Sequence, residues 1–172
     1  MNHRLSVLIA LALVALTACG APTAASDGTA TTPTPGGSSP VHTGLGSVKD
    51  EGDIPNPCTL LTDAGVADLT GREVSATDED GAAPGESTRY CQWQQPSGQL
   101  DIFLSRTSEA DFKTTIADAQ PVAGVGEDAF ALSGHLYVLY GTVQIDVYSR
   151  GDTEERNLEV EKKVAKVLIA KI

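Results

Sequence analysis

A glycine motif typical of dinucleotide-binding loops, G-x-G-x-x-A, occurs at Gly124–Ala129, and Asp146 follows about 20 residues later. In a nucleotide-binding fold, such glycines lie between a strand and a helix whose N-terminus faces the pyrophosphate. Here strand-like residues and then Gly134 follow the motif, and no helical pattern begins at it. We therefore expect a tight turn that enters a strand, and no dinucleotide cofactor.

A second candidate for chemistry is the acidic run Asp78-Glu79-Asp80, followed by Gly81. Aligning Gly81 with the sixth position of a calcium-binding loop places Ala76 first and Ser87 twelfth, where a bidentate glutamate is required. The run is therefore not an EF-hand, and we expect a solvated acidic loop. Whether Asp78-Glu79-Asp80 binds a cation weakly stays open, and the sequence assigns no metal ligand.

Catalytic patterns are weak. No G-x-S-x-G nucleophile elbow occurs, and His135 is the only histidine after Cys58. A glycosidase pair drawn from Asp101, Asp128 and Asp146 is conceivable, but nothing in the pattern singles out two of them. We therefore predict no catalytic residue, and a small hydrolase is the least favoured of the alternatives.

The N-terminus has the features of an export signal. Arg4 precedes an apolar run from Val7 to Leu16, which is much shorter than the roughly 20 residues of a membrane-spanning helix. The stretch Leu16-Thr17-Ala18-Cys19-Gly20 resembles the bacterial lipoprotein signal, in which cleavage precedes a lipid-carrying cysteine. We expect a signal peptide at 1–18, lipid on Cys19, and a location on the extracytoplasmic face of the cell membrane. An ordinary signal peptide and a permanent membrane helix are the alternatives.

Two further cysteines, Cys58 and Cys91, remain once Cys19 is assigned to lipid. Two thiols in an exported protein most simply form one disulfide. A redox pair would favour the spacing C-x-x-C, and a zinc site would need two more ligands, so both alternatives are weaker. We expect a structural disulfide.

Composition separates a tether from a folded domain. Residues 19–50 are rich in Gly, Pro, Ser, Thr and Ala, which predicts a disordered linker, and the first aromatic residue is Tyr90. A single globular domain is expected at 51–172. The chain has 12 Lys and Arg against 23 Asp and Glu, a formal net charge of -11, which excludes nucleic acid as a partner.

The order of expected elements predicts an α+β fold. The patterns indicate helices near 63–70, 108–119 and from 153 onward, and strands at 72–77, 90–95, 100–105, 136–140 and 143–148. Cys91 and Trp93 should share a face, and Phe112 with Ile116 should form the apolar stripe of the middle helix. Strands joined in hairpins favour an antiparallel or mixed sheet covered on one face by helices.

Three short motifs support a family resemblance. Behind the lipoprotein signal and the Pro/Thr linker, they are NPCTLLT at Asn56–Thr62, CQW at Cys91–Trp93 and VGEDA at Val125–Ala129. Their order resembles the actinobacterial lipoproteins of the domain-of-unknown-function 3558 family, and the resemblance covers residues 53–172. It implies that the two cysteines pair, and it implies an envelope location, but it leaves the biochemical role undefined.

These observations predict a non-catalytic binding or interaction module of the cell envelope, held to the membrane through Cys19. Its partner would be an envelope protein or a small ligand, and a structural protein without a ligand is the alternative. A concave pocket lined by Phe130, Tyr137 or Tyr140 would favour ligand binding.

Overall fold

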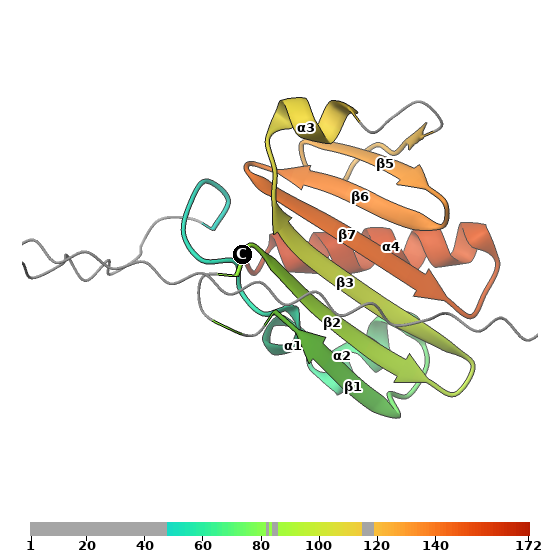
Figure 1. Ribbon diagram of the computed structural model, residues 1–172. Helices are drawn as coiled ribbons and strands as arrows, with labels where there is room; N and C mark the ends of the chain where they lie inside the picture. Colours follow the sequence, from blue (N-terminus) through green and yellow to red (C-terminus); the bar gives the residue numbers. More distant parts are fainter. Residues whose placement is uncertain (1–47, 82, 84–85, 115–118) are drawn as a thin grey trace, which may run out of the picture. The chain divides into compact units, whose positions relative to one another are not determined.

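Seven antiparallel strands form one sheet in the order β1-β2-β3-β7-β6-β5-β4 in the computed structural model (Figure 1). The structure describes residues 48–81, 83, 86–114 and 119–172, all within one compact unit, His42–Ile172. The strands are β1 (Ala76–Asp80), β2 (Thr88–Gln95), β3 (Gly98–Arg106), β4 (Gln120–Pro121), β5 (Asp128–Leu132), β6 (His135–Tyr140) and β7 (Val143–Arg150). The helices are α1 (Pro57–Leu60), α2 (Asp63–Thr70), α3 (Glu109–Thr114) and α4 (Glu154–Ile169).

Two-residue turns join three pairs of neighbouring strands in the sheet. Pro96-Ser97 joins β2 to β3, Ser133-Gly134 joins β5 to β6, and Gly141-Thr142 joins β6 to β7. Ser133 and Gly134 both have positive φ, at 53° and 82°, as a tight hairpin turn requires. Pairing of β3 with β7 then unites the hairpins into one sheet. The expected α+β fold is confirmed, with an antiparallel sheet.

One face of the sheet carries the main core. Residues opposite each other in the ladder share a face, so alternation along each strand separates the two sides. Fully buried residues on this core face are Trp93, Leu100, Ile102, Leu104, Leu136, Val138, Val143, Ile145 and Val147. Helix α4 crosses behind the sheet and packs on this face with Val164, Ala165 and Leu168 (Figure 1).

The disulfide joins Cys58 of α1 to Cys91 of β2, with their Cα atoms 5.3 Å apart. Cys91 and Trp93 are both fully buried in the same core cluster, as the alternation in β2 predicts. The predicted disulfide and its position beside Trp93 on the core face are therefore confirmed.

The opposite face is covered only at one corner by a described helix. Phe112 of α3 is 1% exposed and packs with Phe130 and Leu139 in a second cluster. Ser108 begins this helix as expected, because its hydroxyl oxygen accepts the N–H of Asp111 at 3.1 Å. The expected partner Ile116 lies outside the described residues.

The long helix α4 and the short α2 begin where the sequence predicts. The side-chain oxygens of Thr62 and Thr153 accept backbone N–H groups of the first turns, and Gly71 ends α2 in the left-handed conformation. In α4, Val160, Val164 and Leu168 are buried, whereas Val167 is only half-buried. Among the described helices, none has the length and apolar character needed to cross a membrane.

The first strand corrects an expectation. A strand was expected at 72–77 with a loop from Asp78, but β1 runs from Ala76 to Asp80, where Asp78 pairs with Gln92 and Glu79 with Cys91. All five residues are exposed, because β1 is an edge strand that needs no apolar side. Helix α1 and the short β4 were not expected.

The start of the described chain is attached to the domain. Thr142 donates its N–H to the carbonyl of Lys49 at 2.7 Å, and Arg106 donates to the carbonyls of Val48 at 2.7 Å and Gly52 at 2.6 Å. The described chain is therefore bonded to the folded part from its first residue, Val48, onward.

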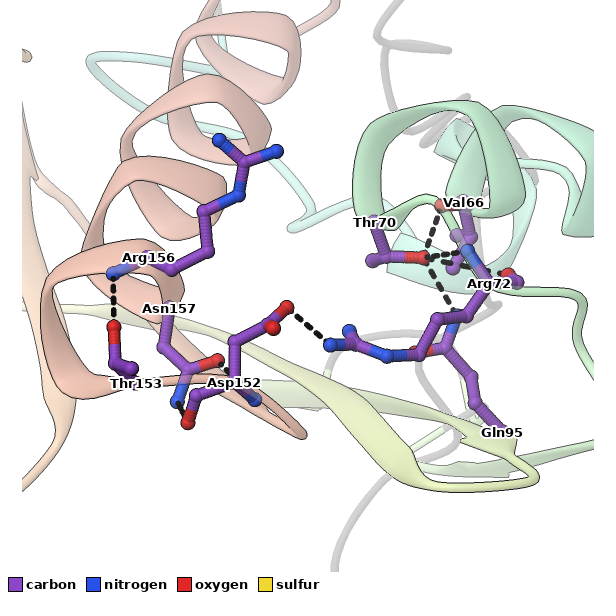
Figure 2. Close-up of polar contacts among 8 residues, drawn as sticks. All are labelled: Val66, Thr70, Arg72, Gln95, Asp152, Thr153, Arg156 and Asn157. Atoms are coloured by element: carbon purple, nitrogen blue, oxygen red, sulfur yellow. Dashed lines mark hydrogen bonds and ion pairs between the residues drawn. The ribbon is translucent and has the colours of Figure 1, made fainter.

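A polar network ties α2 to the end of β2 and to the loop that precedes α4 (Figure 2). The hydroxyl of Thr70 donates to the carbonyl of Val66 at 2.9 Å and accepts from Nε2 of Gln95 at 2.7 Å. Next to it, Arg72 donates to the carboxylate of Asp152. Thr70 and Gln95 are both buried, so these hydrogen bonds replace the ones that their polar groups would make to water in the unfolded chain.

Replacing Thr70 by valine is expected to lower the free energy of unfolding by about 1–2 kcal/mol, because the buried amide of Gln95 loses an acceptor. Urea unfolding measures this change. Thr77→Val is the matched control: its hydroxyl bonds to Asp63 at an exposed site, so its cost should stay within about 0.5 kcal/mol. Equal costs for the two variants would contradict the role given to Thr70.

Candidate functional site

A cavity of about 540 Å³ lies at the end of the sheet where β6 begins. The register places His135 opposite Tyr148, so the last two residues of β7, Ser149 and Arg150, extend beyond the start of β6. The cavity lies next to these two residues, which have no partner in β6, and the Ser133-Gly134 turn and the first turns of α4 border it. We call this space the end cavity, and its size is within the range of small-molecule sites.

The floor of the end cavity contains a buried acid. Glu161 of α4 is 2% exposed, and its Oε1 accepts the N–H of Ser149 at 2.9 Å. This N–H lies past the end of the β6–β7 ladder, and the carboxylate replaces the missing strand partner. The pKa of Glu161 is raised to about 7: burial is the largest cause, the bond from Ser149 lowers the pKa, and the nearby charge of Asp146 adds a smaller rise.

Ser149 itself is the second polar group of the floor. It is 2% exposed, and its Oγ has no hydrogen-bond partner among the described residues. A buried hydroxyl without a partner is costly unless something else supplies one. This arrangement is typical of a surface that is completed by a ligand or by water.

Beside the end cavity, on the face of the sheet opposite α4, His135 pairs with Asp146. Nδ1 of His135 lies 2.8 Å from Oδ1 of Asp146, and the imidazole stacks on Tyr148 with ring centroids 4.7 Å apart. Burial raises the pKa of Asp146, while the bond to His135 lowers it. Such a pair can orient an imidazole as a general base. No Ser, Thr or Cys side chain bonds to His135 within the described part of the chain, so the pair has no nucleophile there.

A third carboxyl, the buried Asp101 of β3, lies on the same face as the half-buried Asp146. Burial raises its pKa, and the side-chain amides of Gln92 and Gln99 oppose this rise. Asp101 in turn raises the pKa of Asp146. Three carboxyls with raised pKa values therefore lie on β7 and on its neighbours β3 and α4, and such clustering is typical of functional sites.

The pKa of Glu161 gives a testable pH dependence. A carboxyl whose pKa is raised on folding from 4.5 to about 7 does not destabilise the folded state below about pH 4.5. Its cost to stability grows between pH 4.5 and 7 and levels off above pH 7. Glu161→Gln cannot ionise and retains an acceptor for Ser149. Between about pH 5 and pH 8, the variant should gain on the order of 2 kcal/mol of stability relative to the wild type.

Urea unfolding of both proteins at the two pH values measures that difference. Glu159→Gln is the control, since Glu159 is exposed and paired with Lys162 at 2.9 Å. A stability difference between wild type and Glu161→Gln that does not change with pH would show that Glu161 does not titrate in this range.

The other residues considered from the sequence lie elsewhere. Cys19 is outside the described residues. Asp78, Glu79 and Asp80 lie on the exposed edge strand and not in a loop, and Glu79 accepts from Asn56 at 2.8 Å. Asp128 accepts its neighbour's N–H at the start of β5, away from the pair formed by Asp101 and Asp146. Within the described residues, no three His, Cys, Asp or Glu side chains are grouped as metal ligands.

The glycine motif forms a turn that enters β5, as expected. Gly124 and Gly126 have φ values of 80° and 62°, and strand β5 starts at Asp128 with no helix in between. The motif therefore lacks the helix N-terminus that would face a pyrophosphate.

The end cavity is not lined by Phe130, Tyr137 or Tyr140, the residues whose pocket would have favoured ligand binding. Phe130 stacks on Tyr137 with centroids 5.0 Å apart, beneath Phe112, and Nζ of Lys49 lies 5.0 Å from the ring centroid of Tyr140. None of these three rings lines the end cavity. The aromatic residues were correctly assigned to the folded part, but their packing partners come from α3 and the start of the described chain.

Two signals in the sequence point to the residues that were missed. Glu161 lies four residues before Ala165 and three before Val164, within the apolar stripe of α4. The Gly141-Thr142 turn fixes the register of β6 and β7, which places Asp146 one diagonal step from His135. Combining register with helix phase would have located both.

Comparison with known proteins gives one match. A family model described as "Protein of unknown function (DUF3558)" matches residues 14–158, which include the sheet and the first part of α4. Comparisons with curated proteins and with solved structures found no significant match.

Proposed function

Because the chain belongs to the DUF3558 family, whose function is unknown, we propose from its site and its leader that it is a non-catalytic binding module of the cell envelope. The observation that carries this proposal is the end cavity, whose floor holds a buried carboxyl and a buried hydroxyl without a partner among the described residues. Polar groups of this kind fix the orientation of a molecule bound in a pocket.

The location is part of the proposal. The signal Leu16-Thr17-Ala18-Cys19 supports a lipoprotein of the actinobacterial kind, anchored through Cys19 on the extracytoplasmic face of the membrane. Two or three acyl chains hold a protein stably, because each buried CH₂ adds about 0.8 kcal/mol. The disulfide agrees with an oxidising compartment.

Intact mass spectrometry of membrane-extracted protein tests the location. We expect the mass to show loss of residues 1–18 and added lipid on Cys19, and Cys19→Ser should release the protein from the membrane fraction. An unmodified Cys19 would exclude the anchor and leave the binding proposal to its own test.

Photocross-linking on intact cells tests the binding. A photoreactive amino acid at position 155, on the rim of the end cavity, should give one dominant adduct with a small molecule or an envelope protein. The same amino acid at position 163, an exposed position of α4 outside the cavity, is the control. The same diffuse set of adducts at both positions would favour a structural protein without a ligand.

A further inference from the structure

The charges around the end cavity are unbalanced. Its lining includes three carboxyls, from Glu154, Glu155 and Glu161. The two basic side chains of the lining already have partners: Arg150 donates to Oε1 of Gln99 at 2.8 Å, and His135 pairs with Asp146. Because Gln99 is neutral, Arg150 keeps its positive charge, and His135 is already paired with a carboxylate outside the lining. The lining thus sets three carboxyls against one guanidinium, and a cationic group is the chemistry that this acidic excess favours.

The floor selects the kind of cation. Glu161 offers carboxylate oxygens, and Ser149 offers a buried hydroxyl oxygen that lacks a partner among the described residues. Hard metal ions such as Ca²⁺ take six or more oxygen ligands, which one carboxylate and one hydroxyl do not supply. A primary ammonium carries its charge on one atom with three N–H donors, so it can bond to both groups at once.

The walls indicate what carries the ammonium. Leu158 of α4, with Ala131 and Leu132 of β5, supplies apolar surface, and Tyr148 is also part of the lining. Apolar walls bury the body of a small ligand, and an aromatic face attracts a nearby cation.

We propose that the end cavity binds a primary ammonium group on a small apolar body, with Glu161 and Ser149 as the acceptors of its N–H groups. This inference rests on the proposed binding function and names its ligand class. Ionised Glu161 is the form that attracts the ammonium, so binding strengthens as pH rises through about 7. Asp146, Glu154 and Glu155 add negative potential, and Arg150 and a protonated His135 oppose it.

Three matched probes test the ligand class on the full chain in detergent micelles, read by amide resonances in heteronuclear NMR spectra. Phenethylamine is cationic, phenethyl alcohol is its neutral counterpart, and hydrocinnamate is anionic. At about pH 8, phenethylamine should shift the amide resonances of Ser149, Glu161 and Gly134 saturably and bind at least about tenfold more tightly than the alcohol. Hydrocinnamate should shift none of them.

Variants assign the acceptors. Glu161→Gln should weaken phenethylamine binding by about tenfold or more, and Ser149→Ala severalfold, while Glu159→Gln on the exposed side of α4 should leave it unchanged. Lowering the pH to about 5.5 should weaken binding to the wild type much more than to Glu161→Gln.

The outcomes separate the two proposals. If the alcohol or hydrocinnamate binds the end cavity as tightly as phenethylamine, or if Glu161→Gln binds normally, the ammonium assignment is wrong and the cavity remains a binding site of another class. If none of the probes shifts a cavity resonance, the ammonium assignment fails. A diffuse adduct pattern at position 155 would then reject the binding function as well.

Discussion

Reducing the Cys58–Cys91 disulfide is expected to lower the free energy of unfolding by about 3 kcal/mol, a large share of the total stability of a small domain. The bridge joins residues separated by 33 positions, so it removes much of the freedom of the unfolded chain between α1 and β2. It also holds α1 against the core face, where Cys91 is fully buried beside Trp93. Urea unfolding with and without a thiol reductant measures the effect.

A double variant controls for side effects of the reductant. Cys58→Ser with Cys91→Ala should match the reduced wild type to within about 1 kcal/mol and should not respond to the reductant. If reduction leaves the wild type unchanged while the thiols are shown to be free, the bridge contributes nothing to stability. The packing of α1 against β2 and β3 would then be enough to hold this helix in place.

Features of the fold that depend on neighbouring residues in the sequence could be predicted, whereas features that depend on contacts between distant segments could not. Alternation in β2, β3 and β7 sets which side chains face the core, and Thr62, Gly71 and Thr153 set helix ends, so these features follow from neighbouring residues. The strand β1 was misplaced because its residues are acidic and exposed, and only pairing with β2 makes it a strand. Partner strands are not visible in a local pattern.

The end cavity required contacts between distant segments. The cavity forms because β7 extends beyond the start of β6 and because the Ser133-Gly134 turn lies next to this extension. It also requires α4 to pack on the sheet with Glu161 facing β7. The sequence contains the helix phase that buries Glu161, but the charge of this residue suggested solvent. Burial of a charged residue is decided by what packs around it, so the helix phase alone does not predict that Glu161 is buried.

The same contrast between local pattern and packing applies to the glycine motif, where substitution of Gly126 by alanine is expected to cost about 3 kcal/mol of stability. Gly126 has a φ of 62°, and an added Cβ would lie 2.3 Å from Cγ1 of Val138 and 2.5 Å from the carbonyl oxygen of Leu139. That oxygen accepts the N–H of Glu127 at 2.8 Å, so it cannot move away without breaking the attachment of the turn to β6.

Gly124→Ala separates this packing role from the phosphate-loop interpretation. Gly124 also has positive φ, at 80°, but a Cβ there meets nothing within 4 Å, so only the left-handed backbone is penalised, by about 1 kcal/mol. Urea unfolding should therefore show a difference of about 2 kcal/mol between the two variants. Equal losses would mean that the backbone angle alone makes glycine necessary at both positions. A nucleotide that stabilised the wild type, and neither variant, would reverse our interpretation, because in a phosphate loop both glycines serve the approach of the ligand.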